Sequence, residues 1–374
     1  MDLVTPSPAL IAWLAFALAF IFGAVANRMN FCTMGAITDV VHVGDWRRLR
    51  MWLLAIAVAI AGVAALDVAG QVDFGKTIYT APQVAWVSCI LGGFLFGFGM
   101  TLASGCGSKT LIRVGAGNLK SLVVLIVLAI AAYMTLKGLF AVWRVNLLDP
   151  FRFDTARFGA GHSDLSSVVA ALSGTGGAGG TLRIVLPLAV AAAIALFVLA
   201  SRDFRESKGM IVAGVIIGAV IVGGWYVSGH LGHVAEDPKT LEEAFVATNS
   251  GKAESFSFVA PTAYSLELLM LWSDQSRIVT FGVAGVLGML LGSFAVAVVT
   301  RTFRWEGFAS VEDLVNHMAG GVLMGFGGVT ALGCTIGQGL TGIATLALGS
   351  MLALSGIVVG CVAELKYQYW RVDA

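Results

Sequence analysis

The sequence predicts an all-α protein that crosses a lipid membrane several times. Of its 374 residues, 58% are hydrophobic and only 12% are charged, and the mean hydropathy is +0.88. Soluble domains carry about 25% charged residues, so these side chains are too few to cover a soluble globule of this size. The formal net charge of +1 also provides no basic field for nucleic acid. The lipid bilayer is therefore the expected surroundings of this chain.

About nine helical spans follow from the intervals between charged residues, because a helix needs about 20 apolar residues to cross a bilayer. The N-terminal residues MDLVTPSP contain no basic residue, so we expect the first span to be retained and not cleaved as a signal peptide. The predicted spans are Leu10–Ala26, Met51–Ala69, Gln83–Ala103, Leu119–Phe140, Leu182–Ala200, Met210–Ser228, Ile278–Thr300, Leu314–Leu332 and Ala344–Ala363.

These spans form one integral membrane domain, residues 1–374. We divide it into a first repeat half (1–140), central helices (182–228) and a second repeat half (278–374), with extracytoplasmic loops at 141–181 and 229–277. The apolar patch Ala263–Trp272 in the second loop is too short to span, so it predicts a surface helix or a partial re-entrant piece.

Two charge-free intervals are too long for a single helix. Thr77–Ser108 has 32 residues and Met318–Ala363 has 46, so each must break. The strong helix breakers there are Ser-Gly-Cys-Gly at 104–107 and Gly-Cys-Thr-Ile-Gly-Gln-Gly at 333–339. Non-helical backbone at membrane depth is tolerated only where protein or water satisfies its polar groups. We therefore expect short re-entrant helices at both breaks.

Basic residues predict the orientation of the chain, because short cytoplasmic connections are enriched in Lys and Arg. With nine spans, most of them fall on one side, which puts the N-terminus outside and the C-terminus in the cytoplasm. The basic residues on that side are Arg47, Arg48, Arg50, Lys109, Arg113, Lys120, Arg202, Arg205, Lys208, Arg301, Arg304, Lys366 and Arg371.

An internal repeat joins the two breaks. Residues 92–107 and 320–335 are identical at nine of 16 positions, at an offset of 228 residues, and the next-to-last residue of each segment is a cysteine, Cys106 or Cys334. The predicted spans that carry them cross in opposite senses, which predicts an inverted repeat. Secondary transporters commonly place their binding sites at such an interface.

The five cysteines show no Cys-x-x-Cys spacing, so a disulfide scaffold, a zinc site and a dithiol redox pair are not expected. We expect no metal and no cofactor. Cys89 and Cys361 are interpreted as small hydrophobic residues that pack. Cys32 differs from them because polar residues, Asn27, Arg28 and Asn30, precede it at the end of the first span.

Three segments resemble the YeeE/YedE family of sulfur-compound membrane transporters over nearly the whole chain. They are Asn30-Phe31-Cys32, Ala103–Gly107, and Gly320 to Phe326-Gly327 together with Gly333–Gly339. The resemblance implies that Cys32, Cys106 and Cys334 line one pathway and contact the substrate, which in the best-described members is thiosulfate. It also implies a small cytoplasmic sulfur-carrier protein as a possible partner, here a separate chain. Met29-Asn30, where family members often have Gly-Arg, and Lys109 depart from the family pattern and leave the substrate species open.

Neutral thiols suit a compact sulfur dianion, because they offer weak S–H donors without repelling it. We expect the backbone N–H groups of short helices after Gly107 and Gly337 to attract the anion, and Gln338 to line the site. Lys109 and Arg113 have two open interpretations, a cytoplasmic anchor or anion attraction. Glu312, Asp313, Asn316 and His317 either form a cytoplasmic cap or take part in proton coupling. Asp39 and His42 are expected to close the turn beyond Cys32, and His42 is an alternative proton site.

The expected function is import of a small sulfur oxyanion across the bacterial inner membrane, without covalent chemistry and not as an enzyme. Three alternatives stay open at this point. One is a membrane sulfur-transfer enzyme in which Cys106 or Cys334 attacks a sulfane sulfur, with Lys109 as the neighbouring cation. The second is a transporter of another sulfur or selenium species. The third is a structural membrane subunit.

Overall fold

The computed structural model describes residues 7–174, 179–236 and 241–373, and most of these residues are helical. The prediction of an all-α polytopic membrane protein is confirmed. The N-terminal residues 1–6 and the parts 175–178 and 237–240 of the two predicted loops lie outside the described residues. The helices are α1 Pro8–Arg28, α2 Thr33–His42, α3 Arg47–Val68, α4 Trp86–Leu102, α5 Gly107–Gly115, α6 Leu119–Lys137, α7 Leu139–Trp143, α8 Leu165–Leu172, α9 Gly179–Leu199, α10 Arg202–Glu206, α11 Lys208–Tyr226, α12 Ala260–Met270, α13 Phe281–Val299, α14 Val311–Thr330 and α15 Leu348–Asp373.

Short elements occupy the connections. They are the helical turns η1 Phe74–Lys76, η2 Arg144–Leu148, η3 Thr155–Phe158, η4 Val227–Leu231 and η5 Gly337–Gly342, and the strands β1 Gln83–Val84, β2 Phe153–Asp154, β3 His233–Val234 and β4 Ala244–Phe245. The strands form two antiparallel pairs, with Gln83 opposite Asp154 and His233 opposite Phe245. The apolar patch predicted as a surface or re-entrant helix is α12.

Eight helical segments among the described residues are long and apolar enough to cross a membrane. The predicted span Leu314–Leu332 forms the 20-residue helix α14 but is not one of these eight. The first two turns of α14 carry Glu312, Asp313 and His317. α14 packs against α4 and α6, so protein surrounds much of its length. The eight segments are Pro8–His42, Arg47–Val68, Trp86–Gly115, Leu119–Lys137, Thr181–Leu199, Lys208–Leu231, Phe281–Val299 and Leu348–Arg371.

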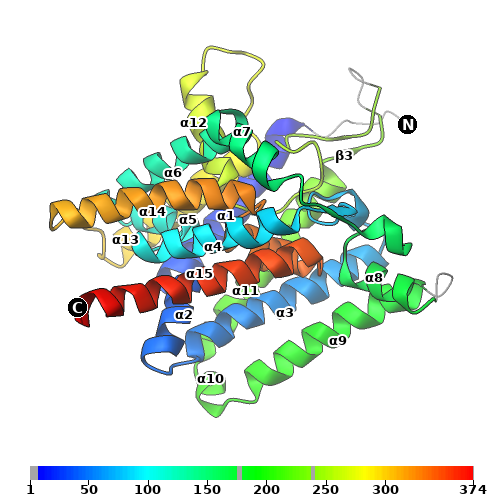
Figure 1. Cartoon of the computed structure of the whole chain (residues 1–374), viewed down its shortest axis with the longest axis horizontal. Helices are drawn as coiled ribbons and strands as arrows, with labels where there is room; N and C mark the ends of the chain where they lie inside the picture. Colours follow the sequence, from blue (N-terminus) through cyan, green and yellow to red (C-terminus); the bar gives the residue numbers. More distant parts are fainter. Residues whose placement is uncertain (1–6, 175–178, 237–240, 374) are drawn as a thin grey trace.

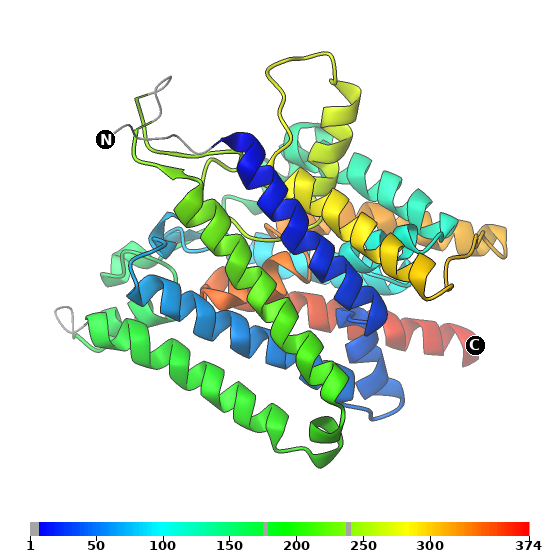
Figure 2. The same ribbon diagram turned by 180° about the vertical axis from the view of Figure 1, so that it is seen from behind.

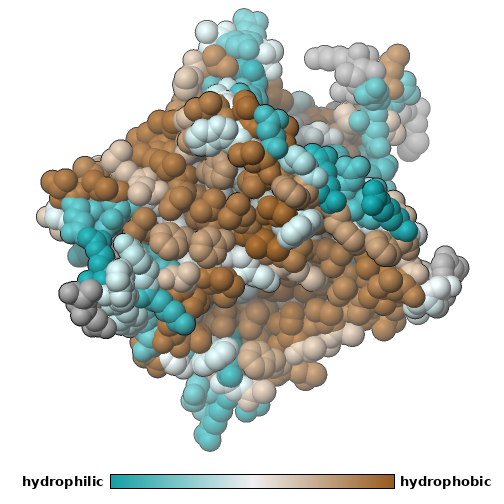
Figure 3. All heavy atoms as spheres, in the orientation of Figure 1, coloured by the Kyte–Doolittle hydropathy of each residue, from teal (hydrophilic) through white to brown (hydrophobic). Residues whose placement is uncertain are grey.

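The long helices lie side by side, and the start of α1 and the end of α15 are at opposite ends of the bundle (Figures 1 and 2). Hydrophobic side chains cover the middle of the face seen in Figure 3, with hydrophilic side chains at the ends. We call one end the basic face; its connections at 116–118 and 300–310 are hydrogen-bonded to each other. The other end, the loop face, carries the two strand pairs and the connections around them.

Glycines bring α4 and α14 into backbone contact. A Cβ at Gly327 would lie 2.5 Å from the carbonyl oxygen of Gly92, and one at Gly320 would lie 2.5 Å from that of Gly99. Since position 92 pairs with 327 and position 99 with 320, the two helices run antiparallel. Such close approach of small residues is typical of membrane helices. An inverted repeat requires its two matching helices to run antiparallel, as α4 and α14 do, although the repeat itself stays a prediction.

The glycine contact gives a test of the packing. We expect Gly327→Ala to destabilise the folded protein by about 1–3 kcal/mol, since its Cβ would also lie 2.6 Å from the backbone nitrogen of Phe96. Thermal unfolding of the detergent-solubilised protein measures the effect. Gly161→Ala is the matched control, because a Cβ there meets no atom within 4 Å. Equal unfolding temperatures for both variants and the parent would contradict this packing.

Candidate functional site

Three helices end in the same backbone turn, and each turn leads to a cysteine. Asn30 after α1, Ser104 after α4 and Leu332 after α14 have positive φ angles of 52°, 55° and 60°. The cysteine follows two residues later in each case, at Cys32, Cys106 and Cys334. Left-handed backbone is uncommon for residues other than glycine. The same turn also ends α13 at Arg301, where no cysteine follows, so the three turns share a helix-end geometry and are distinguished by their cysteines. We call these turns the first, second and third breaks.

Hydrogen bonds close the three breaks identically. In each, the N–H of the residue before the cysteine donates to a carbonyl five residues earlier, as in a Schellman helix end. This satisfies backbone groups that lipid would leave unpaired. The bonds run from Phe31 to Ala26 at 3.0 Å, from Gly105 to Met100 at 2.7 Å and from Gly333 to Gly328 at 2.8 Å.

Each thiol lies at the start of the helix that follows its break. Cys32 Sγ accepts from the N–H of Gly35 at 3.4 Å, and Cys334 Sγ accepts from the N–H of Gly337 at 3.4 Å. Cys106 Sγ lies 3.2 Å from the Ser108 hydroxyl. The three helices are α2, α5 and η5, and the predicted residues Gly107 and Gly337 are the buried first residues of α5 and η5.

The three breaks meet in the interior. The thiols of Cys32 and Cys106 are neighbours, and the Thr335 hydroxyl lies beside Cys106. Cys334 is fully buried, as is Thr335, whose hydroxyl has no hydrogen-bond partner within the described part of the chain. Thr335 was not among the site residues predicted from the sequence. The sequence feature that could have indicated it is its position directly after Cys334, where the first repeat has Gly107 after Cys106.

The Gln338 side chain is hydrogen-bonded to the third break. Its side chain is 1% exposed, and Nε2 donates to the carbonyl of Ala331, where α14 ends. Its Oε1 has no hydrogen-bond partner among the described residues. The amide N–H₂ therefore holds the turn, and the carbonyl oxygen is the free end of this side chain.

A cavity of about 520 Å³ opens beneath the first two breaks on the basic face, with Cys32 and Ser104 in its wall. Its cations are Arg28, Arg48, Lys109 and Arg113. Lys109 Nζ donates to Asn30 Oδ1 at 2.9 Å, and Arg113 donates to the carbonyl of Ser104 at 2.7 Å. Arg48 pairs with Asp39 at 3.1 Å. Lys109 thus links the first break to α5 and also contributes positive charge to the cavity.

A second cavity, of about 220 Å³, lies on the loop face and reaches Gly333 of the third break, next to Cys334. Its wall includes Tyr79, Arg144, Glu254 and Ser257. Burial raises the pKa of Glu254 to about 7. This cavity could not be predicted from the sequence, because its residues come from five separate segments of the chain. The cysteine cluster therefore lies between two cavities that open at opposite ends of the bundle.

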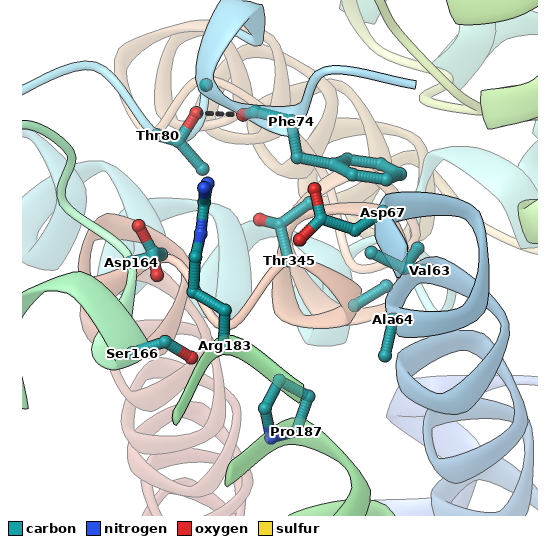
Figure 4. A pocket seen from close by; sticks show the side chains of 12 residues that line it. Val63, Ala64, Asp67, Phe74, Thr80, Asp164, Ser166, Arg183, Pro187 and Thr345 are labelled. Carbon is teal, nitrogen blue, oxygen red and sulfur yellow. Dashed lines mark hydrogen bonds between the residues drawn. The ribbon is translucent and has the colours of Figure 1, made fainter. Parts of the chain in front are cut away.

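A third cavity lies apart from the breaks. Figure 4 shows Arg183 of α9 extending between Asp67 of α3 and Asp164, towards Thr80. Its volume of about 40 Å³ has room for only a few water molecules. It is lined by none of the three cysteines. Across the described residues there is no group of three or more His, Cys, Asp or Glu side chains arranged to hold a metal ion.

The remaining cysteines occupy packed positions, as the sequence suggested. Cys89 packs with Ala331 and Ala353, and Cys361 accepts a hydrogen bond from the Thr101 hydroxyl at 3.1 Å. Neither lines the two large cavities, and Cys106 and Cys334 do not line them directly either; Cys32 is the cysteine found in a wall.

The polar residues at the start of α14 form ion pairs with other helices on the basic face. Asp313 pairs with Lys120 at 2.7 Å, and Glu312 pairs with Arg371 at 2.6 Å. His317 Nδ1 lies 2.7 Å from the Asp313 carbonyl. These contacts favour the cap over proton coupling, the two interpretations that the sequence left open.

Comparison with known proteins places the chain in a family. A family model described as sulphur transport matches residues 28–363. The thiosulfate transporter TsuA of Escherichia coli (strain K12) is 27% identical over 348 residues, which covers 91% of this chain and 90% of that relative. TsuA of Spirochaeta thermophila is 27% identical over 357 residues, covering 93% and 96%. The probable transporter YedE of Escherichia coli is 27% identical over 99 residues, covering 26% and 22%.

Thiol accessibility tests the placement of the cavities. In variants that keep a single cysteine, we expect Cys32 to react with a charged, membrane-impermeant methanethiosulfonate from the basic face, because it lines the larger cavity. A protein that keeps only Cys361 should stay unlabelled, since that thiol is fully buried. Labelling in right-side-out and inside-out vesicles also reports which face is cytoplasmic. Equal labelling of both variants would contradict the assigned geometry.

Proposed function

Since the chain belongs to the sulphur transport (YeeE/YedE) family, we propose that it imports thiosulfate from the loop face to the basic face. The full-length relatives are named as thiosulfate transporters, which supports this substrate. The observation that carries the proposal is the cluster of three cysteine breaks between two opposed cavities. In this proposal the membrane is the bacterial inner membrane, the loop face is external and the basic face is cytoplasmic. The N-terminus is then outside and the C-terminus inside.

Neutral thiols give the path its weak, successive contacts. Thiosulfate is a dianion with a soft terminal sulfur. An S–H group can donate a weak hydrogen bond to it, whereas a carboxylate or a thiolate has no hydrogen to donate and repels it. Conduction requires binding that is favourable enough to admit the anion and weak enough to release it. Passing Cys334, Cys106 and Cys32 in turn meets this need. The backbone N–H groups at the start of α5 add positive potential near Cys106.

The path ends in the cationic cavity. Arg28, Lys109 and Arg113 provide the positive potential that the thiols lack. Moving two negative charges inward against about 100 mV costs roughly 4.6 kcal/mol. Proton linkage, or consumption of the sulfur by a separate small cytoplasmic carrier protein, would offset that cost.

Transport without a covalent intermediate is the proposed mechanism. A sulfur-transfer enzyme needs a thiolate activated by a base or a cation. The ammonium group of Lys109, the cation nearest to Cys106 in the sequence, donates to Asn30. This arrangement supports a role for Lys109 in holding the first break over activation of a nucleophile.

Cysteine substitutions test the path. In bacteria that lack other sulfate and thiosulfate importers, we expect growth on thiosulfate to be rescued by the parent chain. Cys32→Ala, Cys106→Ala and Cys334→Ala should each lose this rescue, whereas Cys89→Ala and Cys361→Ala should keep it. Serine at the three path positions should retain part of the uptake, because a hydroxyl still donates a hydrogen bond. Equal rescue by all five alanine variants, or a persulfide trapped on a path cysteine and seen by mass spectrometry, would contradict the proposal.

Thr335 gives a second test. Thr335→Val keeps the side-chain volume and removes the unpartnered hydroxyl beside Cys106. We expect thiosulfate uptake to fall about tenfold, the effect of losing one hydrogen bond worth roughly 1.4 kcal/mol. Initial rates of labelled thiosulfate uptake measure this. Thr38→Val is the control, because its hydroxyl is bound to the carbonyl of Met34 at 2.9 Å. An unchanged rate in Thr335→Val would exclude the hydroxyl from the path.

A further inference from the structure

We propose that Glu254 is a proton-binding specificity residue of the loop-face cavity, and that the dianion occupies this cavity only when the Glu254 carboxyl is protonated. This inference rests on the proposed function and adds a regulatory proton to its external entrance. It starts from the position of an acidic side chain in the wall of the cavity that leads to the third break.

Glu254 is held in place by its own loop. Its Oε2 lies 3.0 Å from the hydroxyl of Ser250, which can donate to it. Its backbone N–H donates to Ser228 Oγ at 3.0 Å, and its carbonyl accepts from the same hydroxyl. Ser228 belongs to η4 at the end of α11, so the loop is tied to the helix bundle. The carboxyl group therefore has a fixed position in the cavity wall.

The other titratable side chains in the wall do not change charge near neutral pH. Burial raises the pKa of both Tyr79 and Tyr264, so these phenols remain neutral. Arg144 is permanently charged and faces Asp149 at 3.7 Å. Lys252, two residues before Glu254 in the chain, is exposed to solvent. Of the titratable groups that line this cavity within the described residues, Glu254 is thus the one able to switch its charge.

Charge explains why the proton matters. An ionised carboxylate only accepts hydrogen bonds and repels a dianion, whereas the protonated acid has an O–H donor to offer it. In the confined cavity this repulsion is less screened than in water. Because the pKa of Glu254 is raised to about 7, the acid is protonated below neutral pH and ionised above it. Uptake therefore rises as the external pH falls through neutrality, while thiosulfate itself stays doubly charged.

Proteoliposomes containing the full chain test the inference, with the internal pH fixed and the external pH varied. The initial rate of labelled thiosulfate uptake should fall roughly tenfold between about pH 6 and about pH 8 in the parent protein, as expected for one group with a pKa near 7. Glu254→Gln should give a flat profile, because the amide is neutral at every pH. Glu254→Asp should keep a pH-dependent profile.

The matched control is Glu243→Gln, in the same long connection. Glu243 pairs with Lys76 at 2.6 Å and with His233 at 2.5 Å, and it does not line the cavity. This variant should follow the parent profile. A Glu254→Gln profile that falls with pH as steeply as the parent's would overturn the inference.

Calorimetry provides a readout that needs no variant. Thiosulfate binding to the purified protein, measured near pH 7.5 in two buffers of different ionisation enthalpy, should take up roughly 0.8 proton per anion. Binding without proton uptake would overturn the inference and leave the proposed function standing. Absence of both binding and uptake at every pH would instead remove the proposed function, and this inference with it.

Discussion

The structure depends on one constraint: backbone that leaves the helix inside a membrane must still have its hydrogen bonds satisfied. The three breaks meet it with the same turn, in which a left-handed residue redirects the chain and the next N–H returns to the helix that has just ended. The cysteine then stands at the start of the following helix. Its sulfur lies near the N–H or hydroxyl groups there. The turn therefore fixes each thiol at a point that a continuous helix would not offer.

Glycine packing places the breaks relative to one another. α4 is held against α14 through Gly92 and Gly327 and against α15 through Gly97, where a Cβ would lie 2.1 Å from the carbonyl oxygen of Ile357. With the backbones this close, the second and third breaks are positioned by main chain, which has few alternative conformations. Lys109 fixes the first break relative to α5 through its hydrogen bond to Asn30. A cluster of small, weakly interacting thiols keeps its geometry because rigid neighbours hold it.

The second and third breaks could be predicted from the sequence. That the first break has the same backbone turn as these two could not be predicted. Charge-free intervals longer than one span forced breaks around Ser104 and Gly333. At the first break the turn uses Asn30-Phe31 in place of a glycine-containing pair, so only its backbone shows that it belongs with the others.

The loop-face cavity could not be predicted from the sequence. Tyr79, Arg144, Glu254 and Gly333 are far apart in the sequence, and their meeting depends on how the long connections fold. α14 followed its predicted range but carries too many polar residues at its start to count among the apolar spans.

The two ends of the proposed path differ in charge, and this difference suits import of an anion. The loop-face cavity contains one titratable acid and one arginine that faces an aspartate, so its field is close to balanced. The basic-face cavity contains four cations, of which Arg48 has an acidic partner. An anion that passes the thiols therefore moves towards increasing positive potential. The larger cavity is wide enough for water, which weakens each contact through its high dielectric constant. Screened attraction in the wet cavity, and weak attraction at the thiols in the dry stretch before it, let the anion leave without a deep energy minimum along the path.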